Sequence, residues 1–267
     1  MFKYLIPTLL LGLMLSGPTR ADGVNDMAQL DVLDGGLTKR GIYIAALRLT
    51  LPDGWKTYWR APGDAGIPPR FDWRGSRNVG SVSITWPSPD VFDQNGFQTI
   101  GYKTQMVLPI EITPARAGHL IRLGGEMEFG MCKEVCIPST LSFDHTVDAD
   151  APRNPVIVAA LAQRPYSASE AGVSTTTCRL SPTKDGMQIT ANITMPPAGG
   201  REVAVIEPGN PALWSAGTST KRSGNTLIAT TELVNTTSGA FALDRSNIRI
   251  TVLGKRHSVD IRGCDAE

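Results

Sequence analysis

Apolar and polar residues alternate with a period of two along most of this chain, and no other feature of the sequence constrains the fold as strongly. Successive side chains of a β-strand point to opposite faces of a sheet, so this alternation predicts strands with one buried and one solvated face. In the clearest segment, 187–195, the apolar residues are Met187, Ile189, Ala191, Ile193 and Met195. The same pattern occurs in residues 47–51, 82–86, 106–112, 141–147, 248–252 and 259–261.

Short turn sequences separate these segments. Glycine and proline are abundant, with 27 and 19 residues, and clusters of such residues mark turns. The turn sequences lie at 34–36, 52–54, 95–96, 185–186, 199–200 and 223–225. Many short strands punctuated in this way are typical of β-sandwiches, so we expect an all-β fold.

The amino terminus has the pattern of an export signal. Lys3 precedes an apolar run over 5–15, Pro18 ends that run, and small residues lead to Ala21. This arrangement predicts a signal peptide, residues 1–21, that is cleaved after Ala21. The run is shorter than the roughly 20 residues of a membrane span, although an uncleaved anchor is the alternative. We therefore expect an exported, periplasmic protein without stable membrane insertion.

One segment departs from the strand pattern and marks a domain boundary. Asn154 followed by Pro155 is a favourable helix start, and residues 156–163 suit a short helix that ends before Pro165. We interpret 151–174 as a linker that carries this helix. The linker separates an amino-terminal β domain at 22–150 from a smaller, sandwich-like β domain at 175–267.

The charge of the chain excludes some classes of function. The 26 Lys and Arg residues nearly balance the 25 Asp and Glu residues, for a formal net charge of +1. A balanced chain without a basic run argues against nucleic acid or an anionic membrane surface as the main partner. Only three histidines are present, which excludes a His-rich metal site, and we expect no cofactor.

Four cysteines carry the chemistry that the sequence indicates. In an exported protein, Cys132, Cys136, Cys178 and Cys264 are expected to form disulfides, for which three connectivities exist. In an extended strand the Cα atoms of Cys132 and Cys136 would lie about 13 Å apart. A disulfide needs about 4.4–6.8 Å, so residues 133–135 must reverse direction if these two cysteines are joined.

The two expected pairs differ in what they contribute. A bridge between Cys132 and Cys136 closes a very small ring and removes little entropy from the unfolded chain, which favours a redox role. A bridge between Cys178 and Cys264 would close most of the second domain and stabilise it. From spacing alone, the Cys132–Cys136 bridge could also be an inert clip. A copper site formed by Met131, Cys132 and Cys136 is a further alternative, because soft sulfur ligands suit Cu(I).

Several motifs in the first domain resemble those of a known family. They lie at 54–69 (GWKTYWRAPGDAGIPP), 84–87 (ITWP), 92–102, 108–110 and 132–138 (CKEVCIP). In order and spacing they resemble the amino-terminal periplasmic domain of DsbD, and more closely that of ScsB-like proteins. The resemblance covers most of residues 30–148.

This resemblance implies an immunoglobulin-like β-sandwich with protein-disulfide reductase activity. Its two cysteines, here Cys132 and Cys136, would take electrons from a membrane-embedded reductase of the DsbD or CcdA type. They would pass them to periplasmic thioredoxin-like proteins. Because the chain has no later apolar stretch and no Cys-x-x-Cys motif, it is expected to work in trans.

The resemblance also implies which residues surround the cysteines. A loop with an aromatic cap corresponds to 92–102, in which Phe92 or Phe97 is the cap and Tyr102 is the last residue. Tyr58 matches an aromatic position near the site. By its place in the motif, Cys136 is the cysteine expected to meet the partner. A copper-tolerance protein and a non-catalytic β-sandwich interaction module are the competing functions.

Overall fold

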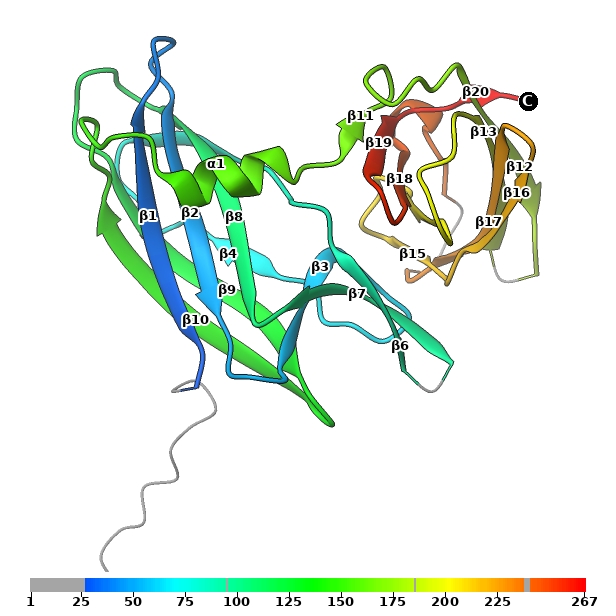
Figure 1. The fold of residues 1–267 in the computed structure, drawn as a ribbon, viewed down its shortest axis with the longest axis horizontal. Helices are drawn as coiled ribbons and strands as arrows, with labels where there is room; N and C mark the ends of the chain where they lie inside the picture. Colours follow the sequence, from blue (N-terminus) through cyan, green and yellow to red (C-terminus); the bar gives the residue numbers. More distant parts are fainter. Residues whose placement is uncertain (1–26, 95, 185, 238–240) are drawn as a thin grey trace, which may run out of the picture.

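The computed structural model describes residues 27–267 except 95, 185 and 238–240, so the predicted signal peptide at 1–21 lies outside the described residues. The strands form four sheets that are arranged as two β-sandwiches side by side (Figure 1). The all-β prediction is confirmed. The clear alternation of 187–195 becomes β13 (Gly186–Thr194), with Ile189, Ala191 and Ile193 fully buried.

The first sandwich consists of two sheets. One contains, in spatial order, β1 (Gln29–Leu37), β2 (Tyr43–Thr50), β8 (Gln105–Pro114) and β5 (Val79–Ile84). The other contains β10 (Cys136–Thr146), β9 (Arg122–Cys132), β3 (Lys56–Gly63), β7 (Phe97–Lys103) and β6 (Asp90–Gln94), with β4 (Arg70–Asp72) paired to β9. Neighbouring strands of both sheets are antiparallel, and β1–β2, β6–β7 and β9–β10 are consecutive in the chain.

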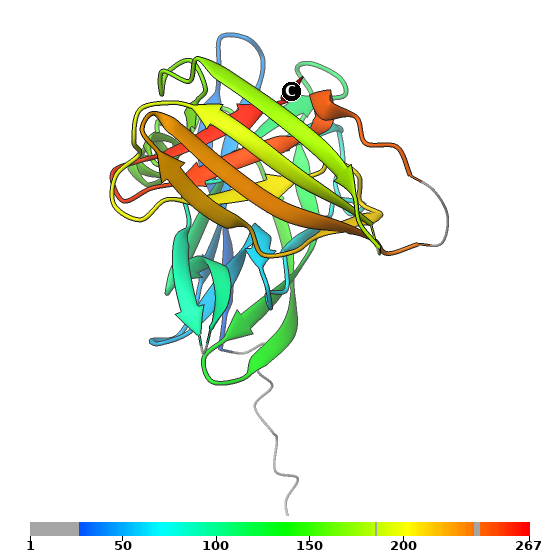
Figure 2. The same cartoon turned by 90° about the vertical axis from the view of Figure 1, so that its right-hand side faces the viewer.

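The second sandwich, which faces the viewer in Figure 2, also consists of two sheets, but its pairs β11–β19 and β12–β20 are parallel. One sheet contains β11 (Tyr166–Ser167), β19 (Ser258–Arg262), β18 (Arg249–Leu253) and β14 (Val203–Glu207). The other contains β15 (Leu213–Ser215), β17 (Thr226–Asn235), β13, β12 (Thr175–Pro182) and β20 (Asp265–Ala266), with β16 (Ser219–Ser223) paired to β17. A short 3₁₀ helix, η2 (Arg245–Asn247), precedes β18.

The helix expected from the sequence is present as α1 (Pro155–Ala162). The side chain of Asn154 accepts a hydrogen bond from the backbone N–H of Val156, and Pro155 occupies the first turn. Ile157 is buried and lies close to Gly35 of β1, so α1 packs on the first sandwich. The chain then continues into β11 of the second sandwich (Figure 1).

Each sandwich has a core of alternating apolar side chains. Leu47 and Leu49 of β2 and Leu108 and Ile110 of β8 are almost fully buried in the first core. Val203 and Leu253 of the second sandwich belong to that same cluster. The two sandwiches therefore share apolar contacts in addition to the linker.

Candidate functional site

The first cysteine pair lies at the turn of a β-hairpin. Cys132 ends β9 and Cys136 begins β10, and the two residues stand opposite each other in the ladder. Their Cα atoms are 4.2 Å apart and their sulfurs form a disulfide. The backbone N–H of Lys133 donates to the carbonyl of Val135 at 3.2 Å, which closes the turn. The predicted reversal of 133–135 is confirmed.

The two cysteines of this bond are not equally exposed. Cys132 is 1% exposed, whereas Cys136 belongs to the exposed residues. Lys133, Glu134 and Val135 are exposed as well, so the hairpin tip projects into solvent. A reactant that approaches from solvent would therefore meet Cys136 first.

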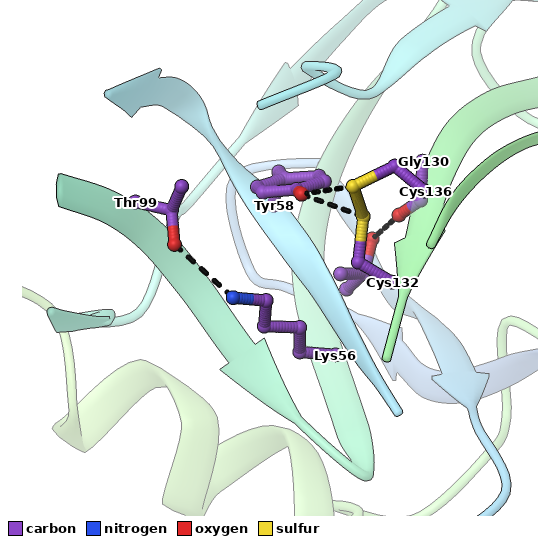
Figure 3. The surroundings of a disulfide bond; sticks show 7 residues. Lys56, Tyr58, Thr99, Gly130, Cys132 and Cys136 are labelled. Atoms are coloured by element: carbon purple, nitrogen blue, oxygen red, sulfur yellow. Dashed lines mark hydrogen bonds between the residues drawn. A yellow bond between two sulfur atoms is a disulfide. The ribbon is translucent and has the colours of Figure 1, made fainter. Parts of the chain in front are cut away.

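Tyr58 lies directly against the disulfide (Figure 3). Its hydroxyl oxygen is 2.6 Å from Sγ of Cys132 and 3.0 Å from Sγ of Cys136. Sulfurs joined in a disulfide carry no hydrogen, so the hydroxyl is the donor. Burial raises the pKa of Tyr58, which keeps the hydroxyl protonated at neutral pH. The site therefore holds a fixed hydrogen-bond donor beside both sulfurs.

The position of Tyr58 follows from its strand and from two glycines. β3 pairs with β9 next to the cysteines, and the hydroxyl of Thr57 donates to the carbonyl of Gly130 at 2.9 Å. A Cβ atom at Gly66 would lie 2.7 Å from the Tyr58 ring, and one at Gly130 would lie 3.1 Å from it. These glycines let the backbone approach the ring closely, and any larger residue would displace it.

The segment expected to cap the site forms the β6–β7 hairpin. The ring of Phe92 lies below two ammonium groups, with its centroid 4.9 Å from Nζ of Lys56 and 5.1 Å from Nζ of Lys103. Phe97 is 58% exposed. Tyr102 is buried in the core, where its hydroxyl donates to the carbonyl of Pro87 at 2.8 Å and burial raises its pKa. Of the four predicted site-lining aromatics, Tyr58 is the one whose hydroxyl bonds both sulfurs.

Lys56 is a site residue that the sequence reasoning missed. It stands opposite Cys132 in the ladder, is 7% exposed, and donates to the hydroxyl of Thr99 at 3.2 Å (Figure 3). Burial lowers its pKa, and the nearby charge of Lys103 lowers it further. The available signal was a lysine two residues before Tyr58, on the same strand face, within the aromatic run 55–59.

The second cysteine pair has a different setting. Cys178 of β12 and Cys264 form a disulfide with a Cα–Cα distance of 5.7 Å, so the predicted pairing is confirmed. Cys178 is fully buried and belongs to the second core, and the bond ties β12 to the chain just before β20.

The residues of the copper alternative do not converge. Met131 is fully buried in the first core, while the neighbouring Cys132 meets Tyr58, because successive side chains of β9 point to opposite faces. Within residues 27–267, apart from the gaps, no group of three or more His, Cys, Asp and Glu side chains is placed to hold a metal ion.

Among the described residues, no helix combines the length and the hydropathy that crossing a bilayer would need.

Comparisons with known proteins agree with the geometry of the first sandwich. Residues 39–147 match the family model described as the N-terminal part of the thiol:disulfide interchange protein DsbD. A comparison with curated protein sequences finds no match. Among solved structures, the N-terminal periplasmic domain of ScsB from Proteus mirabilis is similar, with 22% identity and a TM-score of 0.69.

The similarity to the ScsB structure spans both sandwiches. It covers 91% of this chain and 95% of the ScsB chain. At this identity it establishes the fold, whereas the family match concerns residues 39–147 of the first sandwich, which include Cys132 and Cys136. Over residues 39–147, this chain therefore contains a DsbD N-terminal-like domain.

Proposed function

We propose that this protein is a periplasmic thiol–disulfide interchange protein that relays electrons through Cys132 and Cys136. The observation that carries the proposal is a small-ring disulfide in which one cysteine is exposed and a tyrosine hydroxyl lies beside both sulfurs. The match of residues 39–147 to the DsbD N-terminal model supports the same class of function.

The unequal exposure of the two cysteines supports the following order of exchange steps. A thiolate of a membrane-embedded reductase of the DsbD or CcdA type attacks Sγ of Cys136, the Cys132–Cys136 bond breaks, and Cys132 leaves as a thiolate. The hydroxyl of Tyr58 donates to this leaving thiolate. The second thiol of the reductase then attacks the reductase sulfur of this mixed disulfide and releases Cys136 as a thiolate. Two electrons have passed to the cysteine pair, and the reductase dithiol has become a disulfide.

Delivery of the electrons runs through the same sulfur. The thiolate of Cys136 attacks the disulfide of a thioredoxin-like protein, and Cys132 resolves the mixed disulfide by re-forming its bond to Cys136. The partner is thereby reduced to its dithiol. A periplasmic location is part of the proposal, and the signal peptide predicted at 1–21 and the similarity to the periplasmic ScsB domain support it.

Trapping of the mixed disulfide tests the proposal. Cys132→Ser leaves Cys136 without a resolving partner, so incubation with an oxidised thioredoxin-like protein should accumulate a covalent complex that dithiothreitol dissolves. Cys136→Ser is the matched control and should accumulate far less, because Cys132 is buried. Absence of the complex, together with a reduction potential far below about −300 mV, would identify an inert structural bond and reject the proposal.

A further inference from the structure

The second sandwich contacts the strand that carries Tyr58. Arg60 of β3 donates from Nε and Nη2 to the two carboxylate oxygens of Glu207 in β14, at 3.1 and 2.9 Å. Its Nη2 also donates to the hydroxyl of Thr251 in β18 at 3.1 Å. The side chains of Arg60 and Glu207 are 12% and 24% exposed, so solvent screens this ion pair only partly. Paired hydrogen bonds of this kind also fix orientation.

This contact lies where β3 has little support from its own sheet. Pairing of β3 with β7 stops at Tyr58 and resumes at Gly63, and its pairing with β9 covers Lys56 and Thr57. The ladder of β3 therefore has a gap at residues 59–62. Trp59 is fully buried in the first core, and Arg60, stacked 3.8 Å from the Trp59 ring, reaches the second sandwich.

The loop behind the Tyr58 ring is supported from the same side. Gly66 lies against this ring, and Pro62 and Gly66 also line a cleft of about 580 Å³ between the two sandwiches. Gly217 of the second sandwich approaches Asp64 so closely that an added Cβ would be 2.5 Å from its carboxylate. The second sandwich thus contacts both the strand and the loop that enclose the tyrosine.

We propose that Glu207 is a positioning residue for the redox site, and that the second sandwich acts on the cysteines by holding β3 and the Tyr58 hydroxyl in place. The path from the contact to the disulfide is short, because Tyr58 and Arg60 are only two residues apart in β3. A hydrogen bond weakens steeply with distance and angle, so a small shift of β3 weakens the bonds to Cys132 and Cys136.

The proposal rests on the proposed function for its biological meaning, but its test does not need a protein partner. The readout is the rate at which dithiothreitol reduces the Cys132–Cys136 bond at fixed pH, followed by mass spectrometry after alkylation. Glu207→Ala should slow this rate by about fivefold, less than the roughly tenfold expected when the Tyr58 hydroxyl itself is removed. Glu207→Gln, which retains one acceptor for Arg60, should give an intermediate rate.

Repeating the measurement in a Tyr58→Phe variant separates an effect on the position of the hydroxyl from a general loss of stability. In Tyr58→Phe protein, Glu207→Ala should have no further effect on the rate, because the hydroxyl through which it acts is absent. Glu202→Ala breaks an Arg–Glu pair with Arg222 inside the second sandwich and serves as the matched control. It should lower the thermal midpoint without changing the rate.

The outcomes distinguish the two proposals. The positioning role would be overturned if Glu207→Ala slowed the reduction rate equally in wild-type and Tyr58→Phe protein. It would also be overturned if Tyr58→Phe slowed the rate and Glu207→Ala did not. Failure of the Cys132→Ser variant to form a complex with a thioredoxin-like protein would overturn the proposed function. It would leave the dithiothreitol result intact.

Discussion

Replacing Tyr58 with phenylalanine removes one oxygen atom from the site and leaves the ring in its slot between Gly66 and Gly130. In the oxidised protein the hydroxyl contacts two neutral sulfurs, which are weak acceptors. After reduction it can donate to a thiolate, which is a much stronger acceptor. The substitution should therefore destabilise the reduced, ionised state more than the disulfide state.

The size of the effect follows from the hydrogen bond that is lost. A hydrogen bond to a charged group contributes about 1.5–3 kcal/mol. One pKa unit corresponds to about 1.4 kcal/mol. Tyr58→Phe should therefore raise the pKa of the cysteine thiol whose thiolate accepts this hydrogen bond by about one to two units. At a pH where the wild-type thiolate is formed, the reduction potential should fall by about 30–60 mV for this two-electron couple.

The assay measures iodoacetamide alkylation of the reduced protein as a function of pH, together with a glutathione redox titration. Tyr102→Phe is the matched control, since it removes a buried hydroxyl that donates to the carbonyl of Pro87. It should cost stability and leave the thiol pKa unchanged. A thiol pKa in Tyr58→Phe equal to that of wild type would refute the assignment of Tyr58 as the thiolate donor.

Three further expectations concern the disulfides, the hairpin and pH. Removing the Cys178–Cys264 bond with paired alanines should lower the free energy of unfolding by about 4–5 kcal/mol in urea titrations, because its ends are 86 residues apart; a loss below about 1 kcal/mol would contradict this. Phe97→Ala, at an exposed position, should leave the thermal midpoint within about 1 °C while changing the rate of complex formation with a thioredoxin-like protein; an unchanged rate would exclude Phe97 from the contact. Because burial lowers the pKa of Lys56, the unfolded chain binds its proton more tightly, and stability should rise with pH on approach to 10.5. Lys56→Met should flatten that rise in urea titrations, and an unaltered pH dependence would count against it.

The sequence predicted the local features of this molecule well, since they depend on neighbours in the chain. Period-two alternation identified β13 and its buried face, and Asn154 followed by Pro155 identified the start of α1. The spacing of Cys132 and Cys136 required the reversal that the hairpin provides, and the pairing of all four cysteines was correct. The motifs of 54–69 and 132–138 indicated the DsbD-like domain that the family match covers.

What the sequence by itself determined is therefore the class of fold, the position of the turns and the pairing of the cysteines. Only the tertiary structure decided that Tyr58 bonds both sulfurs, that Lys56 lies over Phe92, and that Arg60 reaches Glu207. These contacts join residues far apart in the chain, and they depend on strand register and on the packing of one sandwich against the other. Apolar alternation and residue spacing are local patterns of a few residues. They carry no information on which distant strand lies beside a given strand.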